Sequence, residues 1–262
     1  RLYDFCERFG VPHRRCGKLI VATSQEQLLD LKAIHAVATG NGVQLDWLEP
    51  ADVERKEPEI TCTGALFSPA TGIIDSHAYM LALLGDAEAH GATLVCGSGV
   101  KSAEVHAGGI ELHLEQSEAA LRAKLLINCA GLGAPQFAAS IRGFPPQHVP
   151  RAWLAKGNYF MLSGRSPFQR LVYPVPEPGG LGIHLTLDLA GRARFGPDVQ
   201  WIESPDYEVN AARGESFYAA IRRYWPALSE GSLQPAYAGI RPKISGPGEP
   251  AADFRIEGPE TH

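Results

Sequence analysis

Residues 123–141 read AKLLINCAGLGAPQFAASI, and this stretch decides the expected fold class. The apolar run over 125–129 is typical of a buried strand, and it breaks at Gly131 and Gly133 before a segment of helical character. A strand that passes through glycines into a helix is a unit of the α/β folds. Where such a strand ends, the backbone can approach a nucleotide cofactor closely, although a turn required only for packing has the same pattern.

A second unit of the same kind precedes this one. In residues 75–100, DSHAYMLALLGDAEAHGATLVCGSGV, Asp75 or Ser76 caps a helix that ends at Gly91, and TLVC follows as a short apolar strand. Between the two units, residues 101–115 hold two alternating strands around a GG pair. The central part of the chain is therefore predicted to be α/β.

The parts of the chain on either side are richer in strands. Residues 1–74 predict a short helix, the strand GKLIVAT and a helix that begins at a Ser24–Gln27 capping box. Residues 147–240 are typical of an antiparallel sheet followed by a helix that ends before Pro226. The apolar face of that helix is predicted to hold Phe217, Ile221 and Tyr224 or Trp225. We expect an α/β protein, α+β overall, whose chain crosses between two domains more than once, with a site at their interface.

Composition and charge exclude several classes of protein. The 262 residues carry a net charge of -5 with basic residues spread throughout, so no surface for a nucleic-acid backbone is expected. Five scattered cysteines without a CxxC pair predict neither a disulfide framework nor a metal site, and a reducing cytoplasm is the simplest location. No apolar run reaches the length of a membrane span, so we expect any membrane contact to be peripheral, at the inner face.

The glycine-rich phosphate-binding fingerprint GxGxxG is missing from the sequence. The GLG tripeptides at 131–133 and 180–182 both lack the third glycine. The chain also opens on RLYDFCERFG, which has the pattern of a helix interior, and it stops at EGPETH just after a strand-like stretch. We therefore expect both ends to be incomplete, with any main phosphate loop upstream of residue 1.

Several long sequence blocks resemble one known family. They are HRRCGKLIVAT, SPATGIIDSHAYMLAL, INCAGLGA, YPVPEPGGLGIHLTLDLAGRARFGPDVQW, and RRYWPAL with LQPAYAGIRPKISGPGEPAADFRI. They make nearly the whole chain similar to the FAD-dependent L-2-hydroxyglutarate oxidase and dehydrogenase group of the D-amino-acid oxidase superfamily. The resemblance implies a Rossmann-like FAD/NAD(P)-binding domain, at 75–146 and 241–262, interleaved with an antiparallel-sheet substrate domain at 1–74 and 147–240. The family's N-terminal GxGxxG segment and C-terminal glycine-rich segment have no counterpart in these blocks.

The same resemblance implies residues that bind FAD and substrate. Ala130 and Gly131 match the second FAD-binding strand motif, and Val100 matches a position whose backbone meets the adenine end. In the GIRP segment, Arg241 matches the arginine that pairs with the substrate α-carboxylate beside the flavin, and Pro242 follows it at the cofactor. A guanidinium suits a planar carboxylate because it can bind both oxygens, although a surface ion pair is the alternative from the residues alone.

Two histidines are candidates for the group that takes a hydroxyl proton. His184 lies between Ile183 and Leu185 in a strand-like run, so its ring points to one face, and the ordinary pKa of histidine suits proton removal. A core histidine bonded to a carbonyl is the alternative. His77, in the first turn of a predicted helix, is a further candidate for substrate contact, with capping or packing of that turn as its alternative role.

A dicarboxylic substrate needs a second polar or cationic contact, and Tyr173 and Lys156 are candidates for it. Packing of the tyrosine in a sheet and solvation of the lysine are the alternatives. The resemblance implies oxidation of a 2-hydroxy acid, foremost L-2-hydroxyglutarate to 2-oxoglutarate, with hydride passing to FAD and oxygen or a quinone as final acceptor. Two alternatives stay open: an amine oxidase of the same superfamily acting on glycine or D-amino acids, and a binding module without cofactor.

Overall fold

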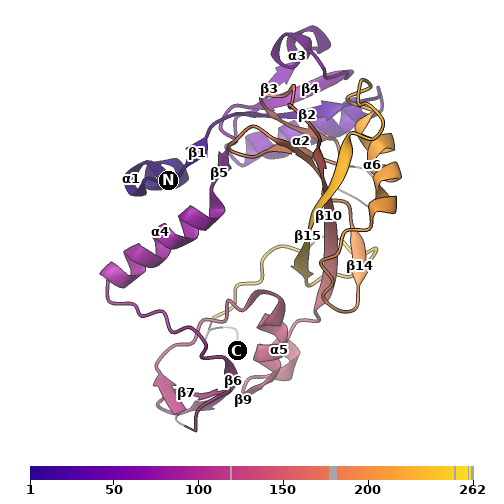
Figure 1. The fold of residues 1–262 in the computed structure, drawn as a ribbon. Coiled ribbons are helices and arrows are strands. Elements are labelled where there is room, and N and C mark those ends of the chain that lie inside the picture. Colours follow the sequence, from indigo (N-terminus) through magenta and orange to yellow (C-terminus); the bar gives the residue numbers. More distant parts are fainter. Residues whose placement is uncertain (119, 177–181, 251, 259, 261–262) are drawn as a thin grey trace. The chain divides into compact units, whose positions relative to one another are not determined.

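A computed structural model gives the fold of the chain, which divides into two compact units (Figure 1). It describes all residues except 119, 177–181, 251, 259 and 261–262. Unit 1 comprises Arg1–Ala87, Lys156–Gln200 and Tyr207–Gly239, and unit 2 comprises Glu88–Ala155, Trp201–Asp206 and Ile240–His262. Each unit joins segments that are distant in sequence. The mixed helices and sheets in interleaved units confirm the predicted fold class.

Unit 1 is built on a mixed sheet to which nine described strands belong. The order is β14 (Gln200–Ile202), β10 (Trp153–Leu162), β13 (Ala193–Phe195), β12 (Leu185–Leu187), β11 (Leu171–Pro174), β2 (Lys18–Ala22), β4 (Gly64–Ser68) and β3 (Asp46–Leu48), and β15 (Leu233–Lys243) pairs with β10. β2 and β11 run parallel, whereas β11–β12, β12–β13, β10–β13, β2–β4 and β3–β4 are antiparallel. The parallel pair joins two distant segments of the chain, as parallel pairing requires. A small additional sheet pairs β1 (His13–Arg14) with β5 (Ile73–Ile74).

Unit 1 also contains helices. They are α1 (Leu2–Phe9), α2 (Gln27–Gly40), α3 (Pro50–Lys56), most of α4 (Ser76–Ala89), and α6 (Gly214–Ile221), which a 3-10 turn at Ala211–Arg213 precedes. α1 ends at Gly10, whose φ of 66° is the left-handed conformation that favours glycine. The prediction that Gln27 forms a capping box with Ser24 is wrong. The Gln27 side chain instead accepts hydrogen bonds from the backbone N–H and the hydroxyl of Thr23.

The main core lies between α6 and one face of the sheet. The predicted apolar residues of this helix and the turn after it are all buried: Phe217, Ile221, Tyr224 and Trp225. The ring of Phe217 lies 4.6 Å, centroid to centroid, from the ring of Phe160 on β10. The hydroxyl of Tyr224 donates a hydrogen bond of 3.0 Å to the carbonyl of Ile183, so its one polar group is paired in the core.

The alternation of side chains along β11 and β12 decides which residues face this core. Val172 and Leu185 are fully buried and lie opposite each other in the antiparallel pair. Leu185 in turn lies opposite the fully buried Phe195 of β13. Because successive residues of a strand point to opposite faces, Tyr173 and His184 point to the other face of the sheet.

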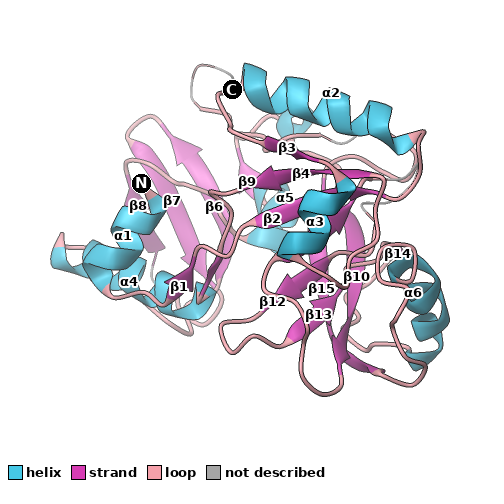
Figure 2. Cartoon of the chain, turned by 90° about the horizontal axis from the view of Figure 1, so that it is seen from above, coloured by secondary structure: helices cyan, strands magenta, loops and turns pink. Residues whose placement is uncertain are grey.

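α2 covers part of that other face (Figure 2). Its buried Leu31 packs in a cluster with Ala22, Leu66 and Val175, and Ile20 packs against the cluster. β2 therefore has apolar contacts on both faces along part of its length, which explains the continuous apolar run LIVA within the predicted strand GKLIVAT.

Unit 2 contains a four-stranded sheet in the order β8-β7-β6-β9. Its elements are β6 (Val100–His106), β7 (Gly109–Leu114), β8 (Ala120–Ala123), a 3-10 turn at Gly131–Gly133, α5 (Ala134–Ala139), β9 (Ile141–Arg142) and a 3-10 turn at Pro146–His148. β6 and β7 pair antiparallel around Gly109, which confirms the predicted pair of strands about the GG dipeptide. Gly109 has a φ of 137°, a value that side chains disfavour.

Two strands predicted for this part of the chain are not observed. Residues 93–96 and 125–129 are described and form no strand. Val95 and Ile127, one from each segment, are 65% and 73% exposed. A strand is stable only when a neighbour supplies partners for its backbone N–H and C=O groups, and no described strand pairs with either segment.

Replacing Phe217 with alanine should lower the free energy of unfolding by about 3–5 kcal/mol, because the variant leaves a cavity beside Phe160. Urea denaturation followed by circular dichroism measures this loss. Leu29→Ala is the matched control, since Leu29 on α2 is 70% exposed and its truncation should change stability by about 0.5 kcal/mol or less. Equal losses in the two variants would contradict the core described above.

Candidate functional site

Two residues predicted for the site, Tyr173 and His184, lie against each other in unit 1. Their rings are stacked, with centroids 3.7 Å apart and planes 7° apart. The register that pairs Val172 with Leu185 places Tyr173 opposite His184 one residue further on. The carbonyl of His184 accepts a hydrogen bond of 2.9 Å from the backbone N–H of Gly196. The imidazole is thus held in a defined plane, and both side chains are partly exposed.

Lys18 belongs to the same group of side chains, although the sequence interpretation missed it. Its Nζ lies 5.0 Å from the centroid of the Tyr173 ring. Lys18 is on β2 and His184 precedes β12, and these strands flank β11 on its two sides. The sequence does contain a sign that Lys18 has a special role, because it is a charged residue at the start of an otherwise apolar strand.

Arginine and tyrosine side chains occupy the neighbouring strands on this face. Thr186, two residues from His184, pairs in register with Arg194 of β13. Arg194 Nη1 donates a hydrogen bond of 3.2 Å to the Tyr237 hydroxyl, and the Tyr237 ring stacks on Tyr159 at 4.6 Å. Arg194 Nε is buried and finds no hydrogen-bond partner in the described part of the chain. The sheet thus presents cationic and aromatic groups on the face opposite the α6 core.

Lys156 lies on the opposite face of the sheet from Tyr173 and His184. It is 2% exposed, and its ammonium group donates a hydrogen bond to the Glu208 carbonyl. Alternation along β10 puts Lys156 on the same face as Phe160, which packs in the α6 core, and opposite to Tyr159. The structure therefore does not bring Lys156 together with Tyr173 and His184.

His77 is exposed in the first turn of α4 and does not join the pair of stacked rings. The cap of this helix is Asp75, whose carboxylate accepts a hydrogen bond of 3.0 Å from the backbone N–H of Ala78. Of the two predicted caps, Asp75 is thus the one observed, and the turn does not require His77 for capping.

The remaining predicted residues belong to unit 2. Gly131 follows Ala130 at the start of a 3-10 turn and has a φ of 58°, so the left-handed backbone explains the glycine. Asn128 stabilises this turn, since its side chain accepts a hydrogen bond from the Ala130 N–H and donates one of 2.8 Å to the Ala134 carbonyl. Val100 is the first residue of β6 and is 37% exposed.

Arg241 and Pro242 lie near the end of β15, and both are exposed. β15 runs through both residues and ends at Lys243. Exposure leaves the guanidinium of Arg241 accessible to an anion.

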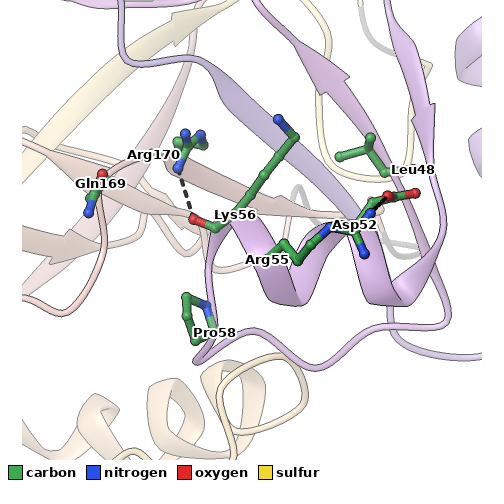
Figure 3. A pocket seen from close by; sticks show the side chains of 7 residues that line it. All are labelled: Leu48, Asp52, Arg55, Lys56, Pro58, Gln169 and Arg170. Carbon is green, nitrogen blue, oxygen red and sulfur yellow. Dashed lines mark hydrogen bonds and ion pairs between the residues drawn. The ribbon is translucent and has the colours of Figure 1, made fainter.

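A separate surface pocket lies beside the last turn of α3 (Figure 3). Its volume is about 600 Å³, and its lining residues are Leu48, Asp52, Arg55, Lys56, Pro58, Gln169 and Arg170. Arg170 Nη1 donates to the Lys56 carbonyl at 2.9 Å and to the carboxylate of Glu57 at 3.2 Å, and Arg55 pairs with Asp52. Arg170 thus joins the end of α3 to its own segment, whereas the Arg55–Asp52 pair lies within α3.

Two solved proteins have a similar fold. L-proline dehydrogenase from P. horikoshii superposes with a TM-score of 0.79 at 17% identity, covering 97% of this chain and 67% of that one. L-alpha-glycerophosphate oxidase from Mycoplasma pneumoniae, solved with FAD bound, gives a TM-score of 0.77 at 17% identity, covering 89% and 62%. The chain has the fold of these oxidoreductases.

The chain belongs to the FAD dependent oxidoreductase family, which it matches over residues 1–260. Mitochondrial L-2-hydroxyglutarate dehydrogenase from Arabidopsis thaliana is 40% identical across the whole chain. L-2-hydroxyglutarate dehydrogenase from Escherichia coli K12 is 25% identical over 93% of the chain. The chain spans 63% and 66% of the length of these two relatives.

The described residues also bear on membrane-spanning helices and metal sites. No helix there has the length and apolar character needed to cross a membrane. Within the same residues, no group of three or more histidine, cysteine or acidic side chains is arranged to hold a metal ion.

The buried carboxyl of Glu57 predicts a pH dependence of stability. Burial raises the pKa of this group above its ordinary value of 4.5, more than the hydrogen bonds from Gln169 N–H and Arg170 lower it. The folded chain therefore binds this proton more tightly than the unfolded chain, and it loses stability as the pH rises from 4.5 through the raised pKa.

Urea unfolding of wild type and Glu57→Gln between about pH 4 and pH 8 measures this effect. Because the glutamine does not titrate, the stability of wild type relative to the variant should decrease as the pH rises. An advantage of wild type that grows with pH would contradict the raised pKa.

Proposed function

We propose that this chain contributes to the FAD-dependent oxidation of a 2-hydroxy acid, with L-2-hydroxyglutarate as substrate and 2-oxoglutarate as product. The observation that supports this best is the stacked Tyr173–His184 pair, on the face of the sheet in unit 1 that also carries Lys18 and Arg194. An imidazole on such a face can accept a proton, and the relatives that match the chain carry the name L-2-hydroxyglutarate dehydrogenase.

The residues of unit 2 fit FAD as a cofactor. A Cβ added at Gly131 would meet no atom within 4 Å, so the backbone of this turn is open to close approach. We assign cofactor contacts to Ala130, Gly131, Val100 and Pro242, within FAD-binding parts at 75–146 and 241–262. When bound, FAD would supply the hydride acceptor, and the protein would supply positioning.

His184 and Arg241 have the two chemical roles that the reaction needs. Oxidation of a secondary alcohol removes the hydroxyl proton and, as hydride, the hydrogen on C2. We assign the proton to an imidazole nitrogen of His184, whose ring plane the stack on Tyr173 defines. We assign the α-carboxylate to the exposed guanidinium of Arg241, which can bind both of its oxygens.

Anaerobic bleaching of the flavin absorption by a panel of L- and D-2-hydroxy acids and amino acids tests this function. L-2-hydroxyglutarate should bleach the flavin fastest. Bleaching by glycine or D-amino acids alone would indicate an amine oxidase, and a purified protein without flavin bands or FAD uptake would indicate a binding module.

Replacing His184 with glutamine should slow flavin reduction by L-2-hydroxyglutarate about 100- to 10,000-fold, because the amide cannot accept the hydroxyl proton. Stopped-flow absorbance under anaerobic conditions gives the rate. His106→Gln is the control, since His106 is exposed at the end of β6 and should leave the rate unchanged. An unchanged rate in His184→Gln would remove this residue from the mechanism.

The final electron acceptor and the location in the cell belong to the same proposal. We propose oxygen or a quinone as acceptor, and oxygen consumption compared with reduction of a soluble quinone distinguishes them. We propose a cytoplasmic location with peripheral contact at the inner face of a membrane, which cell fractionation tests.

A further inference from the structure

Lys18 is held at the edge of the stacked pair by the main sheet of unit 1. β2 and β11 are parallel, with Lys18 in register with Leu171 and Ile20 in register with Tyr173. Lys18 and Ile20 point to the same face because they are two residues apart, and this is also the face of Tyr173. The 5.0 Å distance from Nζ to the Tyr173 ring shows that the ammonium group turns toward the aromatic pair.

This ammonium group has no acidic partner in the part of the chain that the structure describes. Among the described residues, no carboxylate contributes to its electrostatic environment, and burial alone lowers the pKa of Lys18 from its ordinary value of 10.5. A partly buried cation without a counter-ion costs free energy, which an aromatic ring offsets only in part. An anion bound beside Lys18 would offset the remainder.

Two other cations of this sheet already donate hydrogen bonds. Arg194 donates to the Tyr237 hydroxyl, and its guanidinium lies over the Tyr237 ring at 5.4 Å from the centroid. The ammonium group of Lys156 lies on the α6 side of the sheet and donates to the Glu208 carbonyl. Lys18 is therefore the better candidate for binding an anion beside Tyr173 and His184.

We propose that Lys18 binds the distal carboxylate of a dicarboxylic substrate whose hydroxyl group lies at His184. This inference rests on the function proposed above and names the residue that would select a dicarboxylate over a monocarboxylate. The distance from Nζ to the imidazole centroid cannot exceed the sum of 5.0 Å and 3.7 Å. A five-carbon 2-hydroxy diacid carries its second carboxylate three carbons beyond the hydroxyl-bearing carbon, a span that fits within this limit.

Steady-state kinetics of the FAD-loaded holoenzyme with two L-2-hydroxy acids tests the proposal. Lys18→Met should raise KM for L-2-hydroxyglutarate about 10- to 100-fold, because a charge-assisted hydrogen bond is lost. KM for L-2-hydroxybutyrate, which lacks the distal carboxylate, should change by less than about 3-fold. Lys18→Arg should retain most of the affinity for the diacid, and Lys32→Met, at an exposed site on α2, is the control.

Calorimetric binding of glutarate and butyrate to the same holoenzymes gives a second measurement that does not depend on turnover. Lys18→Met should lose affinity for glutarate and keep its affinity for butyrate. Equal effects on the diacid and the monoacid, or a weakening that follows a fall in melting temperature, would assign Lys18 a structural role and overturn the proposal. If wild type neither oxidises 2-hydroxy acids nor binds glutarate, the proposed function fails, and the role of Lys18 fails with it.

Discussion

The alternation of side chains across the β11–β12 pair constrains the rest of unit 1. Val172 and Leu185 lie opposite each other and are fully buried against the core that α6 completes. Tyr173 and His184 must then lie on the other face, where their rings stack. A shift of the register by one residue would bury an imidazole among apolar side chains and expose aliphatic ones. The register that buries the apolar face therefore also determines the position of His184, the candidate proton acceptor.

Hydrogen bonds on both sides of His184 strengthen this placement. The Tyr224 hydroxyl, itself buried, donates to the carbonyl of Ile183, and the backbone N–H of Gly196 donates to the carbonyl of His184. A side chain held by a sheet and by its core is positioned more precisely than one on a free loop, which suits the proton acceptor that we propose His184 to be. Lys18 comes to the same place from a distant part of the chain, through the parallel pairing of β2 with β11.

Residue chemistry and residue position carry different information about the site. Lys156 has the charge that a dicarboxylate needs, yet it is buried on the α6 side of the sheet with its ammonium group bonded to a backbone carbonyl. Lys18 has the same charge and faces the aromatic pair. His77 and His184 differ in the same way, since only His184 lies against a second predicted residue. We therefore assign site roles to Lys18 and His184, which the sheet places beside Tyr173, and not to Lys156 or His77.

Local patterns in the sequence determined the end of α1 at Gly10, the strand pair around Gly109 and the apolar face of α6, because each depends on interactions between residues close in the chain. They did not determine whether 93–96 and 125–129 form strands, since a strand needs hydrogen-bonding partners from elsewhere. Only the tertiary structure decided that Lys18, Tyr173 and His184 meet. Strands distant in sequence bring them together, and the register of those strands follows from burying one apolar face of the sheet.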